Sequence, residues 1–90
     1  MSEGLTAEDV RNATFEKPPW GKRGYEEKSV NDFLQLVARR IEGRGHLSAD
    51  DVRGVRFPKP PFGKRGYHED QVDALLDEVA ATIADLDDGS

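Results

Sequence analysis

An internal repeat dominates this chain and sets the limits on its fold. When the sequence is shifted by 42 residues, residues 5–41 align with residues 47–83 without a gap, and 20 of the 37 aligned positions are identical. Self-similarity at a fixed offset is the mark of a repeated structural unit. We therefore divide the chain into repeat 1 (5–41), a linker (42–46), repeat 2 (47–86) and a flexible tail (87–90).

Each repeat opens with the signals of a short helix. Thr6 and Ser48 are each followed three positions later by an aspartate, so the hydroxyl can accept a hydrogen bond from a free amide while the carboxylate reaches back. The acidic residues also favour the positive end of a helix. We predict short helices that start at these two caps and end near Asn12 and Gly54.

A loop follows each short helix. Residues 17–25 read KPPWGKRGY and residues 59–67 read KPPFGKRGY, the densest match between the repeats. Proline disfavours helix at its own position and at the residue before it, and glycine permits turns that other residues resist. We expect no long strand here; at most, residues 13–15 and 55–57 form a short extended pairing.

A longer helix follows Tyr25 in repeat 1 and Tyr67 in repeat 2. Its apolar residues alternate between spacings of four and three, which is typical of a coiled coil or a packed helix pair. This stripe consists of Val30, Leu34, Val37 and Ile41 in repeat 1 and Val72, Leu76, Val79 and Ile83 in repeat 2. Phe33 and Leu36 add a second apolar edge to repeat 1, where repeat 2 has Leu75 and Glu78.

Composition narrows the class of protein. The chain has no cysteine, a 36% hydrophobic fraction and a net charge of −5, with +1 on residues 5–46 and −5 on residues 47–90. Net acidity argues against nucleic-acid binding. The N-terminus has no signal-peptide pattern, and no apolar run approaches the length of a membrane span. We expect a cytoplasmic protein.

Catalytic and ligand-binding patterns are missing from the sequence. Gly21-Lys22 lacks the remainder of a phosphate-binding loop, and no nucleophile and base form a recognisable pair. His46 and His68 have no ligand spacing, so we expect both on the surface. We predict no enzyme activity, no cofactor and no metal site.

The repeated motif resembles the N-terminal domain of DivIVA-family proteins, most closely the actinobacterial type. The resemblance rests on LTAEDVRN, FxKPP, GKRGY and the start of the long helix, and covers residues 5–41 and 47–83. It implies a cytoplasmic scaffold of cell division and polar growth that recruits division or wall-synthesis partners. It also implies a mostly α fold of two short-helix, crossed-loop and longer-helix units. Family members carry one copy followed by a long coiled coil; this chain has two copies.

The crossed loops are the predicted membrane-binding site. An aromatic ring beside two cations suits an anionic bilayer surface, and the resemblance implies that Trp20 and Phe62 insert while Arg23 and Arg65 meet headgroups. The full set is Trp20, Lys22, Arg23, Phe62, Lys64 and Arg65. The alternative is that each ring packs inward and leaves a solvated basic turn. If the loops do bind lipid, the protein sits at the inner face of the cell membrane.

Two further alternatives stay open from sequence. The long helices pair within one chain as a pseudo-dimer, or two chains exchange them as a swapped homodimer. The function is either membrane docking, or a protein-only adaptor that pairs with a full-length relative or another coiled-coil partner without membrane contact.

Overall fold

Four helices account for most of the chain. The computed structural model describes residues 4–88, and these contain α1 (Ala7–Arg11), α2 (Glu27–Ile41), α3 (Ala49–Gly54) and α4 (Glu69–Asp88). No strand occurs within those residues. The prediction of a mostly helical fold, with a short and a long helix in each repeat, is confirmed.

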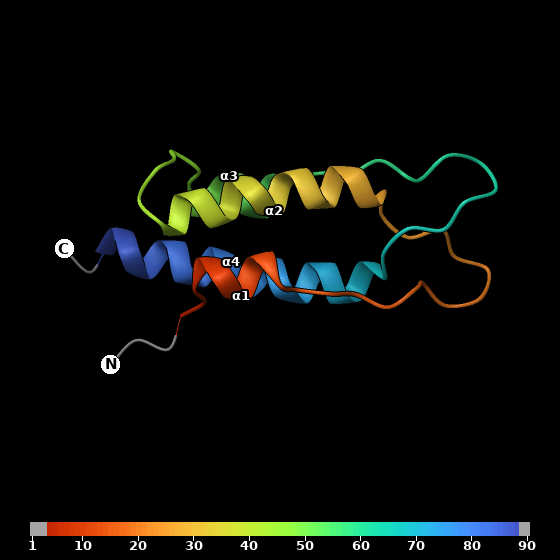
Figure 1. The fold of residues 1–90 in the computed structure, drawn as a ribbon, viewed down its shortest axis with the longest axis horizontal. Coiled ribbons are helices and arrows are strands. Elements are labelled where there is room, and N and C mark those ends of the chain that lie inside the picture. Colours follow the sequence, from red (N-terminus) through yellow and green to blue (C-terminus); the bar gives the residue numbers. More distant parts are fainter. Residues whose placement is uncertain (1–3, 89–90) are drawn as a thin grey trace.

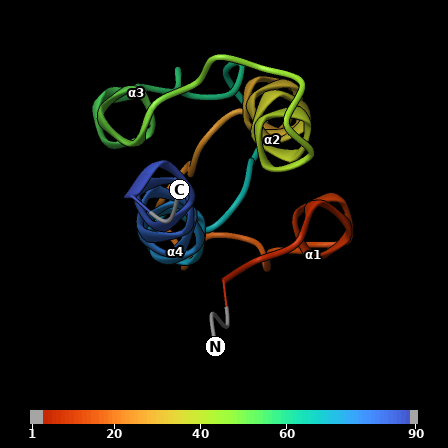
Figure 2. The same cartoon turned by 90° about the vertical axis from the view of Figure 1, so that its left-hand side faces the viewer.

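The molecule is a rod of 46 × 22 × 20 Å. The two long loops, residues 12–26 and 55–68, lie at one end of the rod, and the linker between α2 and α3 lies at the other (Figure 1). The long helices α2 and α4 lie side by side and run in the same direction, away from the loops, whereas α1 and α3 point back toward the loops (Figure 1). Viewed along the rod, α1 packs beside α2 and α3 beside α4 (Figure 2). The start of α1 and the end of α4 lie toward the end opposite these loops.

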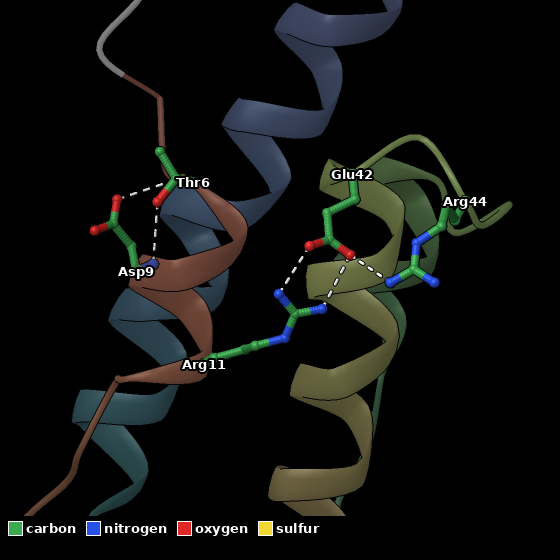
Figure 3. A network of polar contacts seen from close by, with 5 residues as sticks. All are labelled: Thr6, Asp9, Arg11, Glu42 and Arg44. Carbon is green, nitrogen blue, oxygen red and sulfur yellow. Dashed lines mark hydrogen bonds and ion pairs between the residues drawn. The ribbon is translucent and has the colours of Figure 1, made fainter.

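The short helices start where the capping signals place them. Thr6 Oγ1 accepts from the Asp9 amide at 3.1 Å and Asp9 Oδ2 accepts from the Thr6 amide at 3.0 Å (Figure 3). Ser48 and Asp51 make the same reciprocal pair at 3.0 Å each. Such boxes satisfy amides that have no partner within the helix. Without them, helices of five and six residues would have little stability of their own.

The core lies along the apolar stripes of the two long helices. Val30, Leu34, Val37, Val72, Leu76, Val79 and Ile83 are buried, and Ile41 is half-buried at the end of α2. Val10 and Val52 carry the short helices into the same cluster. Each such side chain contributes roughly 1.5–3 kcal/mol on burial, so the stripes supply most of the favourable term in a chain with few aromatic residues.

A charged cluster fastens α1 to the end of α2. Arg11 donates two hydrogen bonds to Glu42, at 2.8 and 3.0 Å, and Arg44 donates a third at 2.5 Å (Figure 3). Hydrogen bonding to both guanidinium groups lowers the pKa of Glu42 to about 2. The linker that follows turns at Gly43, where φ is +84°.

The end of α4 differs from the sequence-based expectation. We predicted a flexible tail at 87–90, but the helix continues through Asp88. Acidic residues at a helix C-terminus oppose the dipole; here Arg40 of α2 forms an ion pair with Asp87 that offsets this. Residues 89 and 90 lie outside the described part of the chain.

Candidate functional site

The two loops cross at the start of the long helices. Tyr25 and Tyr67 exchange both backbone hydrogen bonds, at 3.0 and 2.9 Å, in an isolated antiparallel bridge. The Gly66 amide donates to the Arg23 carbonyl at 2.8 Å. The short extended pairing expected at residues 13–15 and 55–57 is therefore wrong in position: the backbone pairing lies about ten residues further along each repeat.

Glycine is required where the loops cross. A Cβ on Gly66 would lie 1.8 Å from the Tyr25 carbonyl oxygen, and one on Gly24 would lie 2.3 Å from that of Tyr67. Gly24 also has a φ of +78°, which L side chains rarely adopt. The two backbones thus approach more closely than any side chain would allow, and this fixes the positions of both loops relative to each other.

Arg23 and Arg65 hold the crossing together through side-chain contacts. The Arg23 guanidinium donates to the carbonyl of Pro60, and the Arg65 guanidinium donates to the carbonyl of Pro18. Both prolines are buried. Each arginine therefore links its own loop to the loop of the other repeat, a role that the sequence did not reveal because it depends on the approach of two distant segments.

Two tyrosines form a layer beneath the crossing. Tyr25 donates to Asp73 Oδ1 at 2.9 Å, and its ring lies 5.2 Å from that of Phe57. Desolvation, followed by the hydrogen bond to Asp73, raises the pKa of Tyr25 to about 12. Tyr67 pairs in the same way with Asn31 at 2.8 Å, and its ring lies 5.0 Å from that of Phe15. Every one of these contacts joins one repeat to the other, as expected for structural tyrosines.

The aromatic residues at the loop tips face solvent. Trp20 is 96% exposed and Phe62 is 97% exposed, so the alternative in which these rings pack inward is wrong. Lys22 and Lys64 are also exposed, and their ammonium groups make no hydrogen bond or ion pair with any residue in 4–88. Both loops lie at the same end of the rod (Figure 1). The structure thus brings two rings and two unpaired cations to one end of the rod, one ring and one cation at the tip of each loop.

The two histidines lie in different environments. His46 is exposed as expected, but His68 is half-buried and its Nδ1 is buried without a partner among the described residues, so the surface prediction for it is wrong. Within residues 4–88, no three potential ligands are close enough to hold a metal ion. None of the helices described is long and apolar enough to cross a membrane.

Sequence comparisons find a partial match to proteins of mycobacterial wall synthesis. A stretch of 37 residues, 41% of the chain, is 64% identical to the cell wall synthesis protein Wag31 of Mycobacterium tuberculosis H37Rv and of Mycolicibacterium smegmatis, and 55% identical to that of Mycobacterium leprae. The matched stretch covers only 14% of these curated relatives. No family model matches the chain, and no solved structure matches it.

Proposed function

We propose that this chain is a non-enzymatic adaptor of the DivIVA type that docks on anionic membrane through its crossed loops and serves cell division or wall synthesis. Similarity to a cell wall synthesis protein over a length equal to one repeat supports the cellular process. The two repeats each contribute one DivIVA-like unit, and their long helices pair within the chain.

The observation that supports membrane docking is the exposure of Trp20 and Phe62 at the tips of the two loops, which lie at one end of the rod. Exposed apolar groups that gather on one surface with polar residues around them are typical of membrane or protein interaction sites. Lys22 and Lys64 flank them, and each cation near an anionic surface contributes about 1 kcal/mol. Because both tips belong to one rigid crossing, insertion of the first raises the effective concentration of the second.

The arginines take a different part in this proposal from that implied by the resemblance. Arg23 and Arg65 already donate to carbonyls of the opposite loop, so we assign the headgroup contact mainly to Lys22 and Lys64. The arginines keep the two tips at a fixed separation, and whatever donors they have left can still meet a phosphate.

A protein-only adaptor that pairs through its long helices is the second candidate, and the structure favours it less. The stripe it would offer to a partner is already buried between α2 and α4. Exchange with another coiled coil would first have to separate two helices that share the core.

The test uses Trp20 as its own probe during titration with anionic and neutral vesicles. Its exposure predicts red emission in buffer, and we expect a blue shift with anionic vesicles only. Lys22→Ala with Lys64→Ala should weaken this binding about 30-fold, the equivalent of about 2 kcal/mol for two cations. Arg39→Ala, which removes an exposed cation near the end of α2 that is far from the loops, is the charge control and should change little. An unchanged spectrum with a folded protein would favour the protein-only adaptor instead.

A further inference from the structure

Equivalent positions of the two repeats can be compared directly, and the repeats differ at two surfaces. The first is a cleft of about 430 Å³ between α4 and the segment after α3. Val52 and Leu76 are buried at its floor and Phe57 is half-buried. Arg53 and Arg56 line it on the α3 side, whereas Asp73 and Asp77 line it on the α4 side. An apolar floor therefore lies between one basic and one acidic wall.

The charges in this cleft are largely free of one another. Arg56 donates only to the backbone carbonyls of Gly54 and Val55, at 3.3 and 3.1 Å. Arg53 lies 3.8 Å from Asp50, which is 98% exposed, so that contact is weak. Asp77 makes no hydrogen bond or ion pair with another residue of 4–88. Asp73 already accepts a hydrogen bond from the Tyr25 hydroxyl at 2.9 Å. Arg53, Arg56 and Asp77 can therefore meet an external partner without breaking a strong internal pair.

The fold does not require these charges. At the positions of Arg56, Asp73 and Asp77, repeat 1 has Thr14, Asn31 and Gln35. Repeat 1 keeps an arginine at the fourth position, Arg11, but there it is bound to Glu42. Asn31 accepts the Tyr67 hydroxyl as Asp73 accepts that of Tyr25, so this contact needs no charge. The same arrangement forms in repeat 1 without the charges of Arg56, Asp73 and Asp77.

The second surface is the exposed face of α2 that carries Leu36, and we call it the ridge. Leu36 and Arg39 also border a hollow of about 340 Å³ that residues 44–47 complete. Leu36 is 50% exposed, although it is a large aliphatic residue in the middle of a helix. Asp32 precedes it by one turn and Arg39 follows by one turn, so all three share one face. Asp32 pairs only with the largely exposed Lys28, and the Arg39 side chain contacts no charged partner among the described residues.

This ridge is specific to repeat 1. Its three positions hold Ala74, Glu78 and Ala81 in repeat 2. A ridge with an apolar centre, an acid on one side and a base on the other is the complement of a cleft with an apolar floor and one wall of each sign. Seven residues of helix separate the acid and the base by about 10 Å.

We propose that Leu36 of one molecule enters the repeat 2 cleft of a second copy of this chain. Asp32 then faces Arg53 and Arg56, and Arg39 faces Asp73 and Asp77. Because the two surfaces differ, the contact is heterologous, and each molecule keeps one free cleft and one free ridge. The chain therefore assembles head to tail without a long coiled coil.

Analytical ultracentrifugation at low salt, from micromolar to millimolar protein, tests this assembly. Wild type should show an average mass that rises with concentration beyond the dimer. The ridge variant is Leu36→Glu and the cleft variant combines Arg56→Thr with Asp77→Gln; each takes the residue that the other repeat has at that position. Both variants should keep the wild-type helix content in circular dichroism, and each alone should stay monomeric.

An equimolar mixture of the two variants gives the sharpest result. The ridge variant still has a cleft and the cleft variant still has a ridge, so the mixture should form a dimer and stop there. Three outcomes would overturn the proposal: a wild-type protein that remains monomeric at millimolar concentration, a dimer whose mass Leu36→Glu leaves unchanged, or a mixture that stays monomeric. Vesicle binding should be the same for all three proteins, so failure here is separable from failure of the membrane proposal.

Discussion

Gly66→Ala tests whether the loop crossing holds the two repeats together. The new Cβ would lie 1.8 Å from the carbonyl oxygen and 2.6 Å from the carbonyl carbon of Tyr25. These are backbone atoms, so no side-chain rotation relieves the clash, and the loops must separate. Separation breaks the two Tyr25–Tyr67 bonds and the bond from Gly66 to Arg23. At about 1 kcal/mol each, the loss is about 3 kcal/mol.

That loss should be large on the scale of this small chain. A domain of this size loses about 4–8 °C in Tm per kcal/mol, so Gly66→Ala should lower Tm by roughly 12–24 °C. Urea unfolding followed by circular dichroism is the appropriate assay, because the exposed Trp20 would report little of the transition. Gly54→Ala is the control, since its Cβ would meet nothing within 4 Å. A Gly66→Ala protein as stable as the Gly54→Ala protein would refute the close approach.

The other predictions concern the tyrosine layer, the core and the charged cluster. Because the pKa of Tyr25 is raised to about 12 from 10, the unfolded chain loses that proton first, and stability should fall as pH rises from 10 to 12. Tyr25→Phe should flatten this decline in Tm measured against pH. Val37→Ala, at a fully buried site, should lower the free energy of unfolding measured in urea by about 2 kcal/mol. Gln35→Ala, at an exposed site, should lower it by less than about 0.5 kcal/mol. Glu42 has a depressed pKa, so its contribution is present above pH 4.5 and lost toward pH 2; Glu42→Gln should make acid unfolding less steep between those values, and an unchanged acid profile would contradict the Arg11 pairing.

Local signals in the sequence were sufficient for the helices. Capping boxes at Thr6 and Ser48 depend on residues three positions apart, and the stripe on α2 depends on a period within one helix, so both can be found from the chain alone. The end of α4 could not be predicted from such local signals, because its last turn is supported by Arg40 from a different helix. The helix boundary there is a tertiary effect.

The sequence indicated which residues form the candidate site at the loop tips, but not what each of them does there. Aromatic and basic residues in a glycine-proline loop marked it as a site, and the resemblance then ranked the arginines with the membrane-binding residues. Arg23 and Arg65 instead reach carbonyls of the opposite loop, about 40 residues away along the chain. A contact between residues so far apart in the chain cannot be found from local patterns in one sequence. The exposure of Trp20 and Phe62, by contrast, follows once the crossing fixes which residues remain outside.

Joining two repeats in one chain has a consequence that two identical chains could not have. α2 and α4 belong to one chain and are joined through residues 42–68, so their pairing is intramolecular and should persist on dilution. In a symmetric dimer, every surface appears twice, and a ridge gained on one helix is gained on both. Here Leu36 and Glu78 occupy equivalent positions with different chemistry. The fused chain can therefore present one ridge and one cleft, while its two loops keep the same GKRGY sequence at residues 21–25 and 63–67 and the same crossing.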